Sequence, residues 1–289
     1  MTTDAPGPCA PDPRVVRDLA IEAAEAVAPR LATVFHDRDT GAQRKGGAHD
    51  VVTDADLWAE RSLRDHLLAA LPSSAVVGEE YGTREGSTHQ PGGAHQVRWH
   101  VDPIDGTINF ATGVPFFCVS IGAEVQGRLV AGVVLDPLRE ECFATAGEVV
   151  ECNGRPLQPS EVAEPLDAVL LTNFPYEAQP FGTSQAQRYG ELLRGFRATR
   201  RLGSVALELA YVAAGRAEAA FAAGAHTWDV AAGAAMLQAA GGRFLTPSGD
   251  GPHAWTDGTR AFAAATGALE LERTPLPAAV AALGGVDVA

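Results

Sequence analysis

The stretch WHVDPIDGTINF, residues 99–110, decides how the rest of this chain is interpreted. Its apolar start predicts a short strand that ends in a turn with two carboxylates, Asp102 and Asp105, three residues apart. Pro103 removes a backbone donor and favours extended geometry at the residue before it. Gly106–Thr107 leaves free backbone N–H groups at the expected start of a helix. Such a turn can bind a divalent cation through its carboxylates and a phosphate through its amides, which indicates phosphoryl chemistry.

Three further segments carry residues that fit the same kind of site. They are DVVTDAD at 50–56, GEE at 78–80, and WDVAA at 228–232, which is followed by AGG at 240–242. Together with the first stretch, they resemble the inositol monophosphatase family of magnesium-dependent phosphatases. The resemblance runs from about residue 45 to about residue 245, and it depends on four blocks in the right order, since each alone is a weak signal. It implies an α/β fold of layered α+β type, an αβαβα sandwich.

The chain is expected to fold in two halves behind a disordered leader at 1–12. An N-terminal α+β half at 13–160 supplies most metal ligands, and a C-terminal α/β half at 161–289 completes the active site. In the first half, apolar spacing predicts a helix pair on a mainly antiparallel sheet, with helices at 13–35 and 53–71 and a Gly/His-rich loop at 83–93. In the second half, strands alternate with helices, which is typical of α/β structure.

Composition limits the classes of function. Hydrophobic residues make up 46% of the 289 residues and charged residues 20%, so the chain is globular rather than disordered. The net charge of -14 argues against a general binder of nucleic acid or anionic membranes. No apolar run is long enough to span a membrane, and the first residues lack the apolar core of a signal peptide. Because the four cysteines show no metal-ligand spacing, we expect a reduced, cytoplasmic protein.

Four carboxylates at the ends of different predicted elements, Glu79, Asp102, Asp105 and Asp229, would form an oxygen-only site if they converged. Such a site suits Mg²⁺. The resemblance implies two or three Mg²⁺ ions: one held by Glu79, Asp102 and the carbonyl oxygen of Ile104, and another by Asp102, Asp105 and Asp229. Each carboxylate alone has a plainer interpretation, because an Asp before Pro forms turns and an Asp early in a helix serves as a cap or dipole partner.

The attacking group is expected to be metal-activated water, since no Ser–His pair or Cys motif supports a covalent route. The resemblance implies that Thr107 and Asp56 orient and deprotonate this water, and that Glu80 supports the site from behind the ligands. Thr107 could also be a helix N-cap, and Asp56 could be a first-turn dipole partner.

Phosphate binding is assigned to backbone N–H groups of Gly106 and Thr107, where a side chain at the glycine would block close approach. The resemblance implies that Asp229 borders the substrate as well as the metal. Lys45 corresponds to a family lysine near the site, although an ordinary exposed lysine explains it equally well.

The substrate end departs from the family pattern at Ala222. Inositol-specific members carry a Glu there that accepts hydrogen bonds from ring hydroxyls, and alanine cannot accept them. The sequence therefore predicts a Mg²⁺-dependent phosphatase of a small inositol, cyclitol or sugar phosphate. Histidinol phosphate, fructose 1,6-bisphosphate and 3′-phosphoadenosine remain alternatives, as does a non-catalytic regulator that binds a phosphorylated ligand. The resemblance also implies lithium sensitivity and a homodimer.

Overall fold

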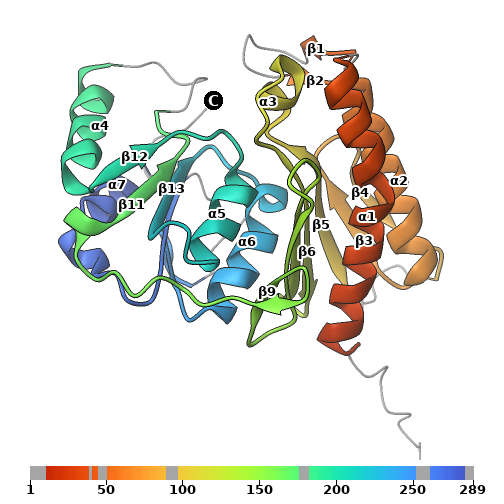
Figure 1. Ribbon diagram of the computed structural model, residues 1–289. Coiled ribbons are helices and arrows are strands. Elements are labelled where there is room, and N and C mark those ends of the chain that lie inside the picture. Colours follow the sequence, from red (N-terminus) through yellow and green to blue (C-terminus); the bar gives the residue numbers. More distant parts are fainter. Residues whose placement is uncertain are drawn as a thin grey trace, which may run out of the picture.

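The computed structural model describes residues 11–38, 41–44, 51–88, 97–175, 182–251 and 261–283. Its elements form alternating layers of helix, sheet, helix, sheet and helix (Figure 1). The predicted αβαβα sandwich is confirmed. Residues 1–10, which make up most of the predicted disordered leader, lie outside the described part of the chain.

The outer layer on one side is the helix pair α1 (Pro13–Asp37) and α2 (Asp54–Ala70). The side chain of Asp12 caps α1 by accepting a hydrogen bond from Arg14 N at 2.9 Å. Thr53 caps α2 in a reciprocal capping box with Asp56. None of the helices in the described ranges combines the length and apolar character that crossing a membrane requires.

The first sheet lies against this helix pair, with strand order β10-β9-β8-β7-β6-β5-β3-β4. All its pairings are antiparallel except that of β3 with β5. Its strands are β3 (Ala75–Gly78), β4 (Gly82–Glu85), β5 (Arg98–Asp105), β6 (Cys118–Val125), β7 (Arg128–Asp136), β8 (Glu141–Thr145), β9 (Val150–Cys152) and β10 (Arg155–Pro156). The prediction of a loop at 83–93 is wrong for residues 83–85, which form part of β4 against β3, and residues 89–93 lie outside the described part of the chain. A separate pair, β1 (Gln43–Arg44) and β2 (Val51–Val52), precedes α2.

The second sheet has the order β12-β11-β13-β16-β14-β15, and β11 runs parallel to both of its neighbours. Helices α4 (Thr183–Gly195) and α7 (Leu276–Leu283) cover its outer face (Figure 1). Its strands are β11 (Val169–Thr172), β12 (Ala198–Arg200), β13 (Ala219–Ala223), β14 (Arg243–Thr246), β15 (Gly249–Asp250) and β16 (Ala261–Ala265). Short 3-10 turns lie at Pro165–Asp167 and Leu271–Arg273.

Helices α5 (Val205–Ala213) and α6 (Thr227–Ala239) fill the layer between the sheets. Every residue from Val230 to Leu237 is buried, as expected for a helix with protein on all sides. Gly132 of β7 lets α6 approach the first sheet, because a Cβ there would lie 3.0 Å from the Cα of Ala232 and closer still to its carbonyl oxygen. The short side chains of the Ala-rich helix thus seat it on the sheet, with its first turn near β5.

Candidate metal centre

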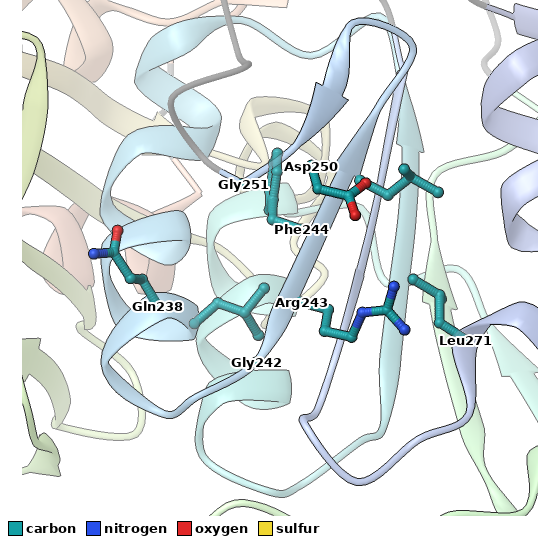
Figure 2. Close-up of a pocket in the computed structure, with 9 residues that line it drawn as sticks. Gln238, Gly242, Arg243, Phe244, Asp250, Gly251 and Leu271 are labelled. Atoms are coloured by element: carbon teal, nitrogen blue, oxygen red, sulfur yellow. The ribbon is translucent and has the colours of Figure 1, made fainter.

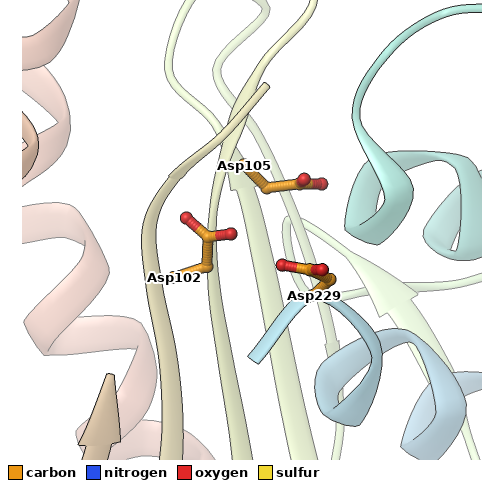
Figure 3. Close-up of side chains that lie close together, drawn as sticks. All are labelled: Asp102, Asp105 and Asp229. Atoms are coloured by element: carbon orange, nitrogen blue, oxygen red, sulfur yellow. The ribbon is translucent and has the colours of Figure 1, made fainter. Parts of the chain in front are cut away.

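Three carboxylates converge where the two sheets face each other. Asp102 and Asp105 come from the end of β5, and Asp229 comes from the first turn of α6. Each offers one oxygen within 4.8 Å of the others, and the side chains point toward one another (Figure 3). The structure therefore brings together three of the four predicted carboxylate ligands in one tight group.

A β-bulge explains how two residues of one strand reach this group. In a regular strand, residues three apart point to opposite faces of the sheet. Here Asp102 pairs with Ser120 and Asp105 with Cys118, so β5 has one more residue than β6 between these pairs. The extra residue turns both carboxylates to the same side. Pro103 lies within this bulge, where proline's missing N–H leaves no ladder bond unmade.

Asp105 is anchored by the beginning of α5, which belongs to the second half of the chain. Its Oδ2 accepts hydrogen bonds from Ser204 Oγ and from Ala206 N, both at 2.6 Å. The thiol of Cys118 lies 4.0 Å from the same oxygen. The beginning of α5 thus fixes the orientation of this carboxylate. Sequence analysis missed Ser204, since only the fold brings this residue next to a partner 99 positions away.

Asp229 serves the helix and the cluster together. Its Oδ2 accepts a hydrogen bond from His226 N at 2.7 Å, which closes a capping interaction at the start of α6. Ser120 Oγ donates to the carbonyl oxygen of Trp228 at 3.1 Å and ties this turn to β6. Asp229 therefore caps the helix, as an isolated Asp at this position would, and its side chain still lies close to Asp102 and Asp105.

Burial, together with repulsion between carboxylates, raises the pKa values in this group. Burial, followed by the charges of Glu79, Asp105 and Asp229, raises the pKa of Asp102 well above its usual range. Burial raises the pKa of Asp105 to about 6, although donation from Ser204 and Ala206 opposes this. Burial and the charge of Asp105 raise the pKa of Asp229 to about 7. Buried carboxylates in contact need a cation or a proton, and this oxygen donor set fits Mg²⁺.

The other two predicted ligands lie beside this group. Glu79 is in the turn after β3 and is not one of the three residues within 4.8 Å, but its charge is felt by Asp102. Ile104 lies within the bulge, and its carbonyl oxygen accepts a hydrogen bond from Thr107 Oγ1 at 3.0 Å. These positions border the carboxylates, and ligation by either residue stays a prediction.

Thr107 and Asp56 meet across the chain. Thr107 Oγ1 lies 3.4 Å from Asp56 Oδ1, although the two residues are 51 positions apart. The other oxygen of this fully buried Asp56 accepts hydrogen bonds from the backbone N and hydroxyl of Thr53, at 2.7 and 2.5 Å. One carboxylate thus caps α2 and also faces Thr107.

The remaining predicted site residues have the following places. Gly106 has a φ of 101° and precedes α3 (Thr107–Thr112), so its left-handed backbone favours glycine. Glu80 follows Glu79 in the same turn and is half-buried. Lys45 lies outside the described residues. Ala222 is buried in β13 opposite Phe262 of β16, so the position of the family glutamate carries an enclosed methyl group.

A separate cavity of about 280 Å³ lies near the other end of α6 (Figure 2). Gln238, Arg243 and Asp250 are among its lining residues, and none of the predicted site residues is. Gln238 lies nine positions after Asp229 in the same helix, a rise of about 13.5 Å. This cavity is therefore not part of the carboxylate site.

Comparison with known proteins gives a consistent result. The chain is 36% identical over 226 residues to the Nus factor SuhB of Escherichia coli K12, which covers 78% of this chain and 82% of that protein. It is 38% identical over 263 residues to an inositol-1-monophosphatase of Mycobacterium bovis, covering 88% and 89% of the two chains.

Solved structures agree with this. The SuhB structure from Bartonella henselae superimposes with a TM-score of 0.80 and 31% identity, over 92% of this chain and 98% of that one. The inositol monophosphatase from Anabaena gives 0.74 and 29%, over 88% and 92%. The model of the inositol monophosphatase family matches residues 12–280, so this chain belongs to the inositol monophosphatase family.

Proposed function

We propose that this protein is a Mg²⁺-dependent phosphatase that hydrolyses a small phosphate monoester, such as an inositol, cyclitol or sugar phosphate. The observation that carries the proposal is the convergence of Asp102, Asp105 and Asp229 in one group, with the first two buried and Asp229 half-buried, beside the Thr107–Asp56 contact. Family membership supports the same reaction class, and the M. bovis relative is named an inositol-1-monophosphatase.

Each residue then has a defined task. Asp102, Asp105 and Asp229 would hold Mg²⁺, with Glu79 and the Ile104 carbonyl oxygen as further ligands. When bound, Mg²⁺ supplies Lewis acidity and neutralises charge on the phosphoryl oxygens. Asp56 would accept a proton through the Thr107 hydroxyl and so orient the attacking water.

The leaving group would lie next to the enclosed surface at Ala222. No carboxylate stands at this position to accept hydrogen bonds from an inositol ring, and a site that lacks such a partner discriminates poorly among ring hydroxyls. We therefore expect a substrate whose alcohol depends less on that contact, which keeps histidinol phosphate, fructose 1,6-bisphosphate and 3′-phosphoadenosine in the tested set.

The test is phosphate release from a panel of monoesters, with Mg²⁺ and with EDTA. The panel contains inositol 1-phosphate, several sugar phosphates and the three alternatives above. Asp102→Asn is the control variant, because it removes the carboxylate expected to bridge the ions while keeping its size. The proposal requires Mg²⁺-dependent turnover that Asp102→Asn lowers by more than about 100-fold with circular dichroism unchanged. Substantial hydrolysis by this variant would overturn the bridging role.

A second candidate is a regulatory protein that binds a phosphorylated ligand or a partner without turnover. The name Nus factor, carried by the E. coli relative, favours it. Mg²⁺ binding by calorimetry without turnover of any panel compound would support this candidate over the phosphatase.

A further inference from the structure

Helix α2 buries three charged side chains on one face. Asp56 and Glu60 are fully buried and Arg64 is 3% exposed, and a spacing of four residues places them in a row. Buried charges are costly unless each one is paired and hydrogen-bonded. Asp56 faces Thr107, whereas Glu60 and Arg64 have no role in the proposed reaction.

Glu60 and Arg64 hold the turn that follows β3. Glu60 accepts hydrogen bonds from the backbone N of Glu80 at 2.6 Å and of Tyr81 at 3.1 Å. Arg64 Nε donates to Glu60 Oε1 at 2.7 Å, and its Nη2 donates to the carbonyl oxygen of Gly82. Glu60 and Arg64 thus form hydrogen bonds with backbone groups of the three residues that follow Glu79.

The end of β3 packs closely against Glu60 and Arg64. A Cβ at Gly78 would lie 2.6 Å from Glu60 Cδ and 2.9 Å from Arg64 Nη2. Glycine at this position lets the turn approach α2 closely enough for its N–H groups to reach the carboxylate. Helix and turn are therefore fixed to each other immediately before and after Glu79.

We propose that Glu60 and Arg64 are positioning residues that hold the Glu79 turn in place and thereby set the affinity of the metal centre for Mg²⁺. The inference rests on the proposed function, because it assigns Glu79 to the metal. A buried ion pair is weak as a source of stability, since well-packed apolar residues often replace it without loss. Its value here lies in the two backbone N–H groups that it orients, as for other groups that support metal ligands from behind.

The test measures Mg²⁺ binding to the full chain by calorimetry. Glu60→Gln places an amide NH₂ either against the Glu80 N–H, which loses one hydrogen bond, or against the Tyr81 N–H and the Arg64 guanidinium, which loses two or more. We expect Mg²⁺ affinity to fall about 10-fold or more. The Mg²⁺ concentration for half-maximal activity should rise by the same factor, while the rate at saturating Mg²⁺ stays close to wild type.

A second variant separates positioning from folding. Glu60→Leu with Arg64→Met removes the whole pair and keeps apolar volume in the core, so the thermal midpoint should stay near wild type while Mg²⁺ affinity still falls. Asp65→Asn is the matched control, because Asp65 on the same helix forms an ion pair with Arg84 of β4 at 2.6 Å, but both side chains are exposed. It should leave Mg²⁺ affinity unchanged.

The outcomes distinguish this inference from the proposed function. If the wild-type protein does not bind Mg²⁺, the proposed function fails. If the wild type binds Mg²⁺ and a folded Glu60→Gln or double variant binds it equally well, the positioning role is wrong. Weaker binding in both folded variants, with the Asp65→Asn control unaffected, supports the inference.

Discussion

At the scale of single residues, the carboxylates of this site divide two tasks between their two oxygens. Asp56 caps α2 with one oxygen and faces Thr107 with the other, and Asp105 gives one oxygen to the start of α5. The sequence left a choice between cap and site for Asp56 and Asp229, and the geometry makes the two compatible. Residue types and spacing were sufficient to predict Asp102 and Asp105 as neighbours, whereas the anchor at Ser204 required the fold.

Removal of the Thr107 hydroxyl should slow the chemical step without weakening metal binding. Thr107→Val keeps the shape of the side chain but cannot pass a proton to Asp56. General acid–base groups contribute about 100-fold or more, so kcat should fall by that factor. Thr107→Ser should recover most of it. Steady-state kinetics with a parallel Mg²⁺ titration checks this, and a kcat of Thr107→Val within a few-fold of wild type would contradict the assigned role.

The stability of the metal-free protein should fall as the pH rises. The pKa values of Asp105, about 6, and Asp229, about 7, lie above the unfolded value of about 3.9. The folded state therefore binds these protons more tightly, and the stabilisation present below pH 4 is lost as the pH passes 6 and 7. Under the proposed function Mg²⁺ would bind the deprotonated carboxylates, so its own stabilising effect should grow over the same range.

Thermal unfolding in EDTA and in Mg²⁺ between pH 5 and pH 8 measures both effects, a range of about three pH units around the raised values. Asp229→Asn is the control in EDTA, because it removes one titrating group and should flatten the dependence. A midpoint in EDTA that rises steadily toward pH 8 would show that the pKa values of Asp105 and Asp229 are not raised in the folded protein.

At the scale of elements, regular periodicity was predictable and local irregularity was not. The long helices and the hairpin strands β6 and β7 show clear apolar spacing, so they lie where the sequence places them. All four residues of β4 are exposed, so no alternation marked it as a strand. The bulge in β5 arises from pairing with β6, a feature that spacing within one strand does not reveal, although Pro103 is consistent with it.

The packing of α6 on the first sheet should be sensitive to the addition of a single methyl group. Gly132→Ala would force a Cβ against the backbone of Ala232, which costs about 1–3 kcal/mol of unfolding free energy in a packed core. The shift of α6 should also displace Asp229 and weaken Mg²⁺ binding. Urea unfolding and calorimetry measure the two effects.

The matched control is Gly190→Ala in α4. Its Cβ would meet only the side chain of Arg194, at 3.4 Å, and alanine is the better helix former. This variant should be stabilised by a few tenths of a kcal/mol to about 1 kcal/mol. If Gly132→Ala matched the wild type in both measurements, the close approach of α6 would not be what places Asp229.

At the scale of the whole molecule, the site draws its residues from both halves of the chain. Its residues come from α2, the turn after β3, the end of β5 and the start of α6, with an anchor from the start of α5. No local pattern predicts such contacts, and the resemblance to a family was what ordered these segments in advance. The net charge of -14 is compatible with the proposed anionic substrate only if a divalent cation binds among the carboxylates, where it would reverse the local field.

The charge of the cation would then determine how strongly the local field is reversed, and replacing Mg²⁺ by Li⁺ tests this dependence. Li⁺ is a small, hard cation that oxygen ligands accept, but its single charge neutralises the three-carboxylate group less and polarises a phosphate less than Mg²⁺ does. Millimolar LiCl at fixed Mg²⁺ should therefore lower the rate of phosphate release, while an equal concentration of NaCl controls for ionic strength. Equal rates in the two salts would show that the carboxylate group does not accept Li⁺ in a way that affects turnover.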